Sequence, residues 1–523
     1  MSPTRRALWA LLFGLFTALP LAVAFGLLER TLGVPSPSEA IFVQVASRLP
    51  GALVTAAIEG LVALLGALDV GPTARAAKEV EHLLAVALFA GGASLFAAVA
   101  AVLTRAHLLV GFAVAGLIAA VVSLAFVMAD PSASAPAPAA AAISLLGWEA
   151  WAIVVALAVG HMERISRRRE TEPRVAAASR RRFILGFAAS SLAVTGLLSV
   201  LSRAAARLPG GGVAGAPLEG APPPARPRTA FVPAPGTRPE ITPVEDFYRV
   251  DINLTPPAVD REPWRLVVDG LVERPLSLRY EDVLALEPEH VVITQECISN
   301  PVGGDLISTQ QISGVPLARV LERAGMDPRA GACNFTCADG YTESLPMRSV
   351  LDERTLLVYG IGGVALPAEH GYPLRLFTPD RFGMKNPKWL TRVEVALEER
   401  PGYWERRGWS QRAQVRITSV VDTQGRLTPM HGKVALGGIA YAGARGISRV
   451  EVQVDDGPFT EAALAPPLSP LSWVLWRQEV KLSPGAHRVR VRAWDGAGRP
   501  QIAEPTDPHP AGATGLHSVV VEV

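Results

Sequence analysis

The stretch Val291–Gly304, VVITQECISNPVGG, decides the fold of the second half of this 523-residue chain. Its apolar, β-branched start predicts a strand that leads into a loop, and Cys297 follows directly after that strand. Asn300-Pro301 and Gly303-Gly304 then turn the loop. A thiol at the end of a rigid strand, with glycines that let a bulky group approach, suits a nucleophile or a ligand to a soft metal. The alternative is a buried small hydrophobe, which is the usual state of a lone cysteine.

A second group of chemically active residues lies in His370–Trp389, HGYPLRLFTPDRFGMKNPKW. Its prolines prevent one continuous helix. Cations on such a stiff, irregular backbone suit a fixed anionic ligand such as a phosphate, and the alternative is a solvated charged surface. The cationic and titratable residues of this segment are His370, Arg375, Arg381, Lys385 and Lys388.

Composition excludes several classes of protein. The formal net charge of +2 gives no case for a nucleic-acid partner, because the basic residues that cluster lie beside apolar segments. Three cysteines in 523 residues exclude a disulfide scaffold. Cys333 and Cys337 lie four residues apart on a predicted strand, about 13 Å between Cα atoms, which is too far for a disulfide.

The first two hundred residues predict a membrane region. Five apolar segments are long enough to cross a bilayer: Ala7–Leu28, Leu83–Leu103, Leu108–Met128, Ile143–Gly160 and Phe183–Val200. A cleaved signal peptide is the alternative for the first segment. The shorter segment Ala52–Leu68 carries Glu59 and is interpreted as an interfacial or re-entrant helix.

Charge predicts the orientation of these spans. Eight arginines lie between His161 and Arg182, and cytoplasmic loops carry such an excess. Five spans with a cytoplasmic N-terminus place this loop inside and everything after Val200 outside, whereas counting Ala52–Leu68 as a sixth span reverses the assignment. Ser179–Leu185, SRRRFIL, is similar to a twin-arginine export signal, and an ordinary positive-inside flank explains it equally well.

The chain divides into four predicted parts: a membrane region at 1–207, a Pro/Gly-rich linker at 208–237, a mixed region at 238–405 and an all-β region at 406–523. The mixed region combines strands and helices without a regular βαβ order, which predicts an α+β domain. Its predicted elements are strands at Trp264–Val268, Val291–Thr294, Asn334–Thr336 and Leu356–Tyr359 and helices at Tyr280–Ala285 and Val315–Ala324. The last region predicts a β-sandwich with strands at Val415–Ile417, Val434–Leu436, Val450–Val454, Glu479–Leu482 and Arg488–Ala493.

The two chemically active segments together resemble a known family. About Glu240–Leu397 resembles the molybdopterin-binding domain of the sulfite oxidase family, and Ser410–Val523 resembles the immunoglobulin-like domain that follows it there. The match is carried by ITQECISN, SGVPLARVL, ADGYTESL, HGYPLRLFTPDRFGMKNPKWL, GISRVEVQVDDGPF and RVRAWDGAGRPQ, in the family's order and spacing.

The resemblance implies a role for individual residues. Cys297 matches the cysteine that binds molybdenum, and a soft thiolate suits a metal that is also bound by the pterin dithiolene. The remaining positions are implied to contact the molybdopterin: Tyr248, Arg249, Cys337, His370, Arg375, Lys385, Asn386, Pro387 and Lys388.

The sequence also departs from the family. Sulfite oxidases carry arginines just after the cysteine motif, where this chain has Asn300-Pro301-Val302. The usual tryptophan before the Gly-Val-Pro-Leu helix start is Ile312. A sulfite-sized anion therefore finds fewer cationic partners.

These observations predict a multi-pass enzyme of the cytoplasmic membrane that performs two-electron oxygen-atom transfer on a small substrate at the periplasmic side. The alternatives are a sulfite oxidase proper and a cofactor-free binding or scaffold protein on the same fold. The expected partners are the bilayer, an electron carrier (a cytochrome or the quinone pool) and a second copy through the C-terminal domain. His82, His107 and His161 lie at span ends, where haem b ligation and an interfacial position are the two interpretations.

Overall fold

The computed structural model describes residues 1–32, 34–68, 73–104, 107–129, 138–168, 173–205, 215–218, 225 and 231–523. The chain forms two compact units. The helical unit comprises Met1–Leu49, Lys78–Gly211 and Ile252–Thr255, and the β-rich unit comprises Pro50–Ala77, Gly212–Asp251 and Pro256–Val523. The predicted linker at 208–237 lies mostly outside the described residues, and its limits stay a prediction.

The helical unit is built from long apolar helices that pack through small residues. They are α1 (Pro3–Leu32), α4 (Thr73–Leu103), α5 (Leu108–Met128), α6 (Pro138–Arg168) and α7 (Pro173–Ala205), with the short α2 (Pro37–Arg48) between α1 and α3. Alanines fill much of the interior, together with Phe13, Phe89, Trp148 and Trp151. Small side chains let helices approach closely, which is how helices associate in a bilayer where burial supplies little energy.

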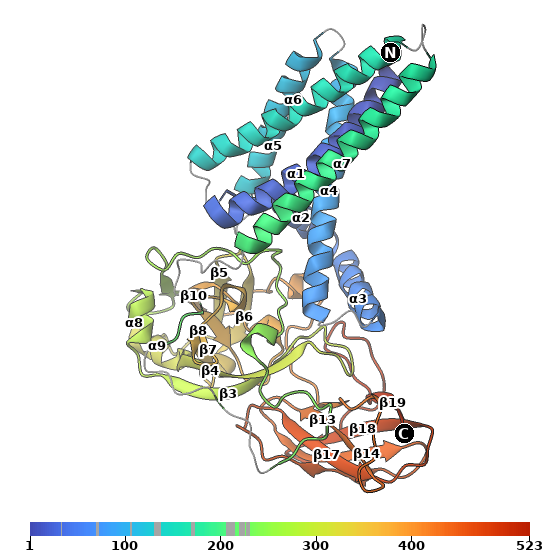
Figure 1. Ribbon diagram of the computed structural model, residues 1–523. Helices are drawn as coiled ribbons and strands as arrows, with labels where there is room; N and C mark the ends of the chain where they lie inside the picture. The colour runs from blue at the N-terminus through green and yellow to red at the C-terminus, as the bar shows by residue number, and fades with distance from the viewer. Residues whose placement is uncertain are drawn as a thin grey trace. The chain divides into compact units, whose positions relative to one another are not determined.

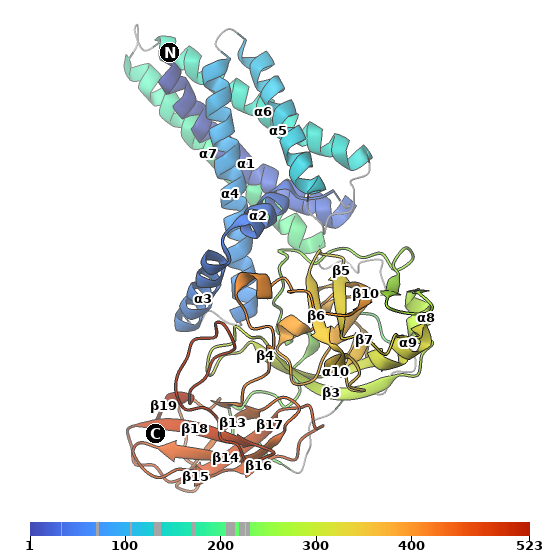
Figure 2. The same ribbon diagram turned by 180° about the vertical axis from the view of Figure 1, so that it is seen from behind.

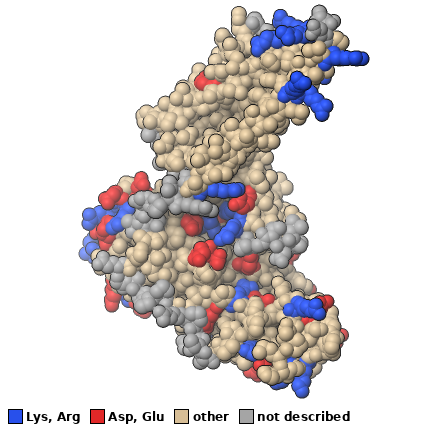
Figure 3. Space-filling model, viewed as in Figure 1, with Lys and Arg blue, Asp and Glu red and all other residues tan. Residues whose placement is uncertain are grey.

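Five of these helices are long and apolar enough to cross a membrane: Pro3–Glu29, Thr73–Leu103, Leu108–Met128, Pro138–Arg168 and Pro173–Ala204. They coincide with the five predicted spans. Leucines and valines point outward along them. Figure 3 shows a nearly uncharged face on the helices, with basic residues at one end. Of the predicted arginine-rich loop, Arg169 lies outside the described residues.

Helix α3 (Gly51–Leu68) groups with the β-rich unit, where it packs against η4 (Glu405–Arg407). Gly51 lies directly on this contact, since a side-chain carbon there would come within 2.9 Å of the Arg407 Cα. Helix α2 was not predicted from the sequence, because it is short and only weakly apolar.

The first part of the β-rich unit contains two sheets and short helices (Figure 1). One sheet has the order β2-β1-β10-β5-β6 and pairs β1 with β10 in parallel. Its strands are β1 (Leu266–Gly270), β2 (Leu276–Leu278), β5 (Ala332–Cys337), β6 (Thr342–Pro346) and β10 (Leu390–Ala396). The other sheet has the order β3-β4-β7-β8, with β9 paired to β7. Its strands are β3 (Glu289–Glu296), β4 (Ile307–Pro316), β7 (Leu356–Ile361), β8 (Val364–Ala365) and β9 (Arg375–Phe377).

The short helices of this part are α8 (Tyr280–Leu284), α9 (Leu317–Ala324) and α10 (Met347–Val350). The α+β prediction is confirmed. The predicted helix at Val315–Ala324 begins later than expected, because Val315 and Pro316 still pair with β7 as the end of β4.

The second part is a sandwich of two sheets (Figure 2). The first sheet contains β11 (Thr418–Val421), β13 (Val434–Tyr441), β16 (Ala463–Leu464) and β17 (Val474–Val480). The second contains β12 (Gly425–Arg426), β14 (Ile447–Val454), β15 (Thr460–Glu461), β18 (Ala486–Asp495) and β19 (Ser518–Glu522). Leu436 and Trp476 from one sheet pack against Val450 and Val491 from the other, and together they form the core.

The predicted strand at Val415–Ile417 was wrong, because the sheet begins only at Thr418. The Val415 N–H donates instead to the Asp380 carbonyl (3.2 Å), and the Val415 carbonyl accepts from Arg445 (2.8 Å). The backbone of Val415 is therefore bonded to the loop before Phe382 and to a side chain of the sandwich, and it does not continue the strand β11. The strand predicted at Glu479–Leu482 overlaps only the last two residues of β17, which runs from Val474 to Val480.

Candidate functional site

Cys297 follows directly after β3 and is held in place by its backbone. Strand β3 pairs with β4 along its whole length, from Glu289 opposite Gly314 to Glu296 opposite Ile307. The Cys297 N–H continues the pairing by donating to the Leu306 carbonyl (2.9 Å). Its side chain is 7% exposed, and its Sγ lies 3.0 Å from the Ser299 Oγ. Burial raises the pKa of this thiol, so a thiolate here needs a cation beside it.

Asn300 closes the loop that carries the cysteine. Its Nδ2 donates to Glu296 (3.0 Å), and its Oδ1 accepts from the Leu306 N–H (3.0 Å). The side chain that replaces a family arginine is therefore used within the loop. Gly303 has a φ of +80°, and the His517 ring from the sandwich packs where a side chain would be.

The sandwich also supports the strand that presents the cysteine. Thr294 donates its N–H to the Leu471 carbonyl (2.9 Å), and its carbonyl accepts from the Tyr441 hydroxyl (2.8 Å). The Trp473 N–H donates to the Thr294 hydroxyl (2.8 Å). Ile298, on the cysteine loop, packs in one buried cluster with residues of both parts. The position of Cys297 therefore depends on the sandwich, which the sequence pattern did not predict.

A buried polar chain connects the cysteine strand to the second segment. The Gln295 Nε2 donates to the Tyr248 hydroxyl oxygen (3.0 Å), and its Oε1 accepts from Arg375 (2.9 Å). Burial raises the pKa of Tyr248 well above its usual range, and the nearby Cys297 charge adds to this shift. Tyr248 therefore stays a protonated donor beside the cysteine. Gln295 was not predicted, although its position two residues before Cys297 places both side chains on one face of the strand.

Arg375 is a buried cation with neutral acceptors. Its guanidinium contacts Gln295, the His370 carbonyl (3.3 Å) and the Asn386 carbonyl (3.5 Å). Among the described residues no carboxylate forms an ion pair with it, and its side chain is 6% exposed. Desolvation lowers its pKa to about 10. A buried charge that lacks a counter-ion is costly, so this position favours an anionic ligand.

Lys388 and Arg249 share one carboxylate. The Lys388 Nζ donates to Asp251 (2.8 Å) and to the Glu369 carbonyl (3.0 Å), and the Arg249 Nε donates to the same Asp251 (2.8 Å). Burial lowers the pKa of Lys388 to about 8. Within this group of three described residues, the cations outnumber the carboxylates. Asp251 was not predicted, and only the fold brings it to Lys388, 137 residues away.

His370 and Asn386 complete the polar surroundings of Arg375. His370 is 3% exposed, and its Nε2 donates to the Val244 carbonyl (3.3 Å), which leaves Nδ1 as an acceptor. Burial, followed by the charges of Lys388 and Arg375, lowers the pKa of His370 to about 3, so its ring is neutral. The Asn386 Oδ1 accepts from the Thr378 N–H (2.7 Å).

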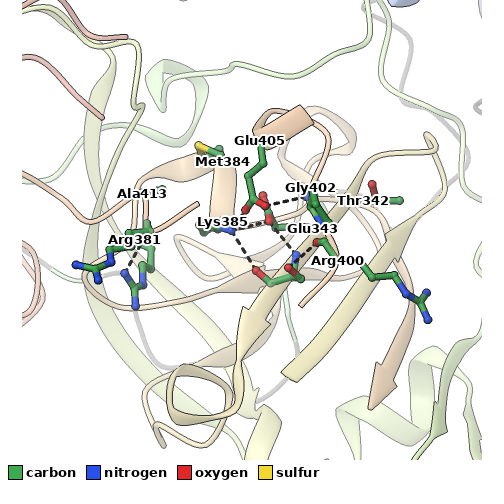
Figure 4. A network of polar contacts seen from close by, with 12 residues as sticks. Thr342, Glu343, Arg381, Met384, Lys385, Arg400, Gly402, Glu405 and Ala413 are labelled. Carbon is green, nitrogen blue, oxygen red and sulfur yellow. Dashed lines mark hydrogen bonds and ion pairs between the residues drawn. The ribbon is translucent and has the colours of Figure 1, made fainter. Parts of the chain in front are cut away.

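The last predicted residues lie in different surroundings. The Pro387 carbonyl accepts from the Leu376 N–H (2.9 Å), which ties the loop to β9. Cys337 is at the end of β5, and burial raises its thiol pKa well above the usual range. Lys385 is enclosed by two glutamates (Figure 4). Arg381 donates to Ser349 (3.2 Å) and to the Arg412 carbonyl (2.7 Å).

The residues present fit a molybdopterin. The Cys297 sulfur has the softness that molybdenum prefers, and a phosphate would give Arg375 the counter-ion that the described residues do not provide. The Asn386 Nδ2 and the Thr378 hydroxyl are buried without a hydrogen-bond partner in the part of the chain that the structure describes. Buried polar groups are normally paired, so two unpaired ones on Thr378 and on Asn386, whose carbonyl Arg375 contacts, indicate that a polar ligand belongs there.

Comparison with known proteins agrees with this chemistry. Residues 253–404 match the oxidoreductase molybdopterin binding domain. The oxidoreductase YuiH of Bacillus subtilis is 34% identical over 153 residues, which are 29% of this chain and 75% of that protein. The sulfite oxidase of Gallus gallus is 29% identical over 296 residues, 47% of this chain and 64% of that protein.

Two further likenesses were found. A protein of Azospira oryzae, provisionally assigned as the protein-methionine-sulfoxide reductase subunit YedZ1, is 34% identical over 152 residues, 29% of this chain and 56% of that protein. The crystal structure of the sulfane dehydrogenase SoxCD from Paracoccus pantotrophus covers 54% of this chain and 83% of that chain, with 23% identity and a TM-score of 0.47.

The matched domain and the sequence relatives define the class: this protein is a molybdenum-dependent oxidoreductase with a molybdopterin-binding domain. The chain belongs to the sulfite oxidase family. The matched range contains every predicted site residue except Tyr248 and Arg249, which lie just before it.

Proposed function

We propose that this protein is a membrane-anchored molybdopterin enzyme that exchanges an oxygen atom with a small substrate of low charge outside the cytoplasm. The bound cofactor would supply the two-electron oxygen transfer. The observation that carries the proposal is the combination of a buried, strand-end cysteine with Arg375, a buried cation for which the described residues provide no carboxylate partner.

Different residues of the chain would then bind the metal, the phosphate, the pterin ring and the substrate. Cys297 would hold the metal, and Arg375 and Lys388 would offset the phosphate charge. His370 is neutral, so its Nδ1 offers the pterin ring an acceptor. Tyr248, protonated and beside Cys297, offers a hydrogen-bond donor to the substrate oxygen.

The surroundings of the cysteine favour a substrate of low charge. Asn300 is used to close the loop, and Pro301 and Val302 carry no charge. Arg249 pairs with Asp251, and Arg381 is held by Ser349 and the Arg412 carbonyl. A sulfite dianion must lose water on entry, and fixed cations have to offset that cost. A sulfoxide or an N-oxide needs less positive potential.

The kinetic test uses the full chain in detergent with an artificial electron carrier. Sulfoxide reduction, in which two electrons and two protons convert a sulfoxide to a sulfide and water, should be faster than sulfite oxidation. A relative assigned to methionine-sulfoxide reduction supports this direction, and the sulfite oxidases among the relatives support the alternative. A sulfite kcat/KM above roughly 10⁵ M⁻¹s⁻¹ would make the protein a sulfite oxidase proper.

The proposed orientation places the β-rich unit in the periplasm and the arginine-rich segment from His161 to Arg182, which includes the end of α6 and the start of α7, in the cytoplasm. Because α3 groups with the β-rich unit, it supports five crossings instead of six. SRRRFIL lies within α7, where it flanks the last proposed span. A cytochrome or the quinone pool remains the proposed electron partner.

Reporter fusions test this orientation. A reporter that is active only in the periplasm should be active when fused after Arg207 and silent when fused after Arg174. A second reporter, active only in the cytoplasm, should give the opposite pattern and serves as the matched control. Periplasmic activity after Arg174 would mean an even number of crossings.

A further inference from the structure

Lys385 lies in a buried ion triad (Figure 4). Its Nζ donates to the Glu343 Oε1 (2.7 Å), to the Ser344 carbonyl (3.1 Å) and to the Glu405 Oε1. The Lys385 side chain is 1% exposed, and those of the two glutamates are 0% and 6% exposed. An ammonium has three donors, so each one already has an acceptor within the protein.

The charge of this triad is unsuited to an anion. Two carboxylates around one ammonium give a net negative charge when all three are ionised. Burial raises the pKa of Glu343 to about 7, and the charge of Lys385 opposes that shift while the charge of Glu405 adds to it. A phosphate placed here would meet two glutamates before it met the lysine. The Lys385 ammonium, which the sequence assigned to the cofactor, therefore has its donors taken up by protein acceptors.

The triad instead anchors the loop that reaches the cofactor site. Lys385 belongs to η3 (Gly383–Lys385) and directly precedes Asn386, whose unpaired Nδ2 lies in the predicted site. A second anchor lies one residue earlier, where the Tyr341 hydroxyl donates to the Met384 carbonyl (2.7 Å). Both anchors come from the β5–β6 hairpin, so this hairpin holds the residues that directly precede Asn386.

Glu405 connects the segment at 402–409 to the triad. The Gly402 N–H donates to the Glu405 Oε2 (3.0 Å), and a side-chain carbon on Gly402 would lie 2.6 Å from the Glu343 Oε1. The Tyr403 N–H donates to the Thr342 carbonyl (2.9 Å), so the segment is bound to β6. This segment continues to Trp409, which packs in the buried cluster shared with the sandwich.

We propose that Lys385 is a positioning residue: with Glu343 and Glu405 it holds the Asn386–Lys388 loop in the geometry that retains the molybdopterin, without touching the cofactor itself. The inference rests on the proposed cofactor site. It differs from the assignment of Lys385 as a phosphate ligand, and the two assignments predict opposite effects for one conservative substitution.

That substitution is Glu405→Gln. If Lys385 were a phosphate ligand, weakening its carboxylate partner would free the ammonium and slow cofactor release. If Lys385 positions the loop, the same change should speed release from the purified full-length holoprotein by about tenfold, the scale of one charge-assisted hydrogen bond. Lys385→Met should act in the same direction and more strongly. Release is followed by the molybdenum and pterin remaining per chain after dilution.

The control is Arg392→Met, which removes an ion pair between β10 and Asp269 of β1 (3.0 Å) that involves neither the triad nor Asn386. It should leave the release rate unchanged, and the thermal midpoints of all variants report whether folding is affected. Unchanged or slower release in Glu405→Gln would overturn the proposal.

A second readout is independent of the cofactor. The amides of Lys385 and Asn386 donate to the Phe382 and Gly383 carbonyls, so their hydrogen exchange reports the order of the loop. Exchange at these two amides should accelerate in Glu405→Gln and stay unchanged in Arg392→Met, even in chains prepared without molybdenum. Absence of cofactor from the wild-type chain would contradict the proposed function, whereas unchanged exchange in Glu405→Gln would contradict the role of the triad.

Discussion

Arg375 and Lys385 are buried cations ten residues apart in one segment, and their surroundings are opposite. Arg375 contacts an amide and two carbonyls, whereas Lys385 contacts two carboxylates and a carbonyl. Among the described residues, the positive charge of Arg375 is therefore not balanced by a carboxylate, whereas the charge of Lys385 is. A phosphate is attracted to the surroundings of Arg375 and repelled by those of Lys385. The counter-ion of each cation therefore tells which cation contacts the cofactor and which one supports the loop, and the presence of a basic residue alone does not.

The largest effect is expected from removal of Cys297, the proposed metal ligand next to the Arg375 region. Cys297→Ala should lead to loss of molybdenum, because it removes the one soft ligand that the protein is proposed to give the metal. Wild-type chains should contain about one molybdenum each by elemental analysis. Cys333→Ala, also a buried cysteine, is the matched control and should retain the metal. Full occupancy in Cys297→Ala would remove the basis of the site.

The next effect tests whether the buried charge of Arg375 binds the cofactor. Arg375→Met should weaken molybdopterin retention by roughly 10- to 100-fold, since it removes one charge-assisted phosphate contact worth about 1.5–3 kcal/mol. The cofactor-free chain should be equally or more stable to heat, because the variant no longer buries a cation without a counter-ion. A large loss of stability in the cofactor-free chain would mean that Arg375 is mainly a structural residue.

A smaller effect is expected at Lys388, which resembles Arg375 in burial but shares Asp251 with Arg249. Lys388→Met should weaken retention by roughly 3- to 10-fold, because a cation already paired with a carboxylate contributes less to an anionic ligand. Asp251 keeps its ion pair with Arg249, so the fold should survive. If Lys388→Met and Arg375→Met lost molybdopterin equally, the counter-ion of a cation would not decide how much that cation contributes to retention.

The smallest effect concerns the Lys385 region and its dependence on pH. The pKa of Glu343 is raised to about 7, so the folded chain binds a proton that the unfolded chain releases near pH 4.5. Stability should therefore fall as pH rises through that window, by several degrees in the thermal midpoint. Lys385, Glu405 and Tyr341 face this carboxyl. Glu343→Gln should reduce the slope, although Glu296, also raised to about 7, should leave part of it. An unchanged slope would mean that Glu343 is ionised throughout.

Much of the site could be predicted because its signals are local. Strand β3 and the cysteine after it follow from an apolar run and the turn residues beyond it. His370, Arg375 and Asn386 lie within seventeen residues, and the fold keeps them together through β9 and the loop at 383–388. The five apolar helices follow from length and composition, which one-dimensional patterns record directly.

The sequence by itself indicated a thiol at a strand end, a compact cationic segment and a set of apolar helices, and its resemblance to the sulfite oxidase family implied the molybdopterin. Tertiary structure alone decided which cation is free to meet that ligand, since Lys385 meets Glu343 across 42 residues and Lys388 meets Asp251 across 137. It also decided what supports the cysteine, since Trp473 donates to Thr294 across 179 residues. The physical reason is that a buried charge takes its character from its counter-ions, and these arrive from strands and loops whose pairing no local pattern specifies.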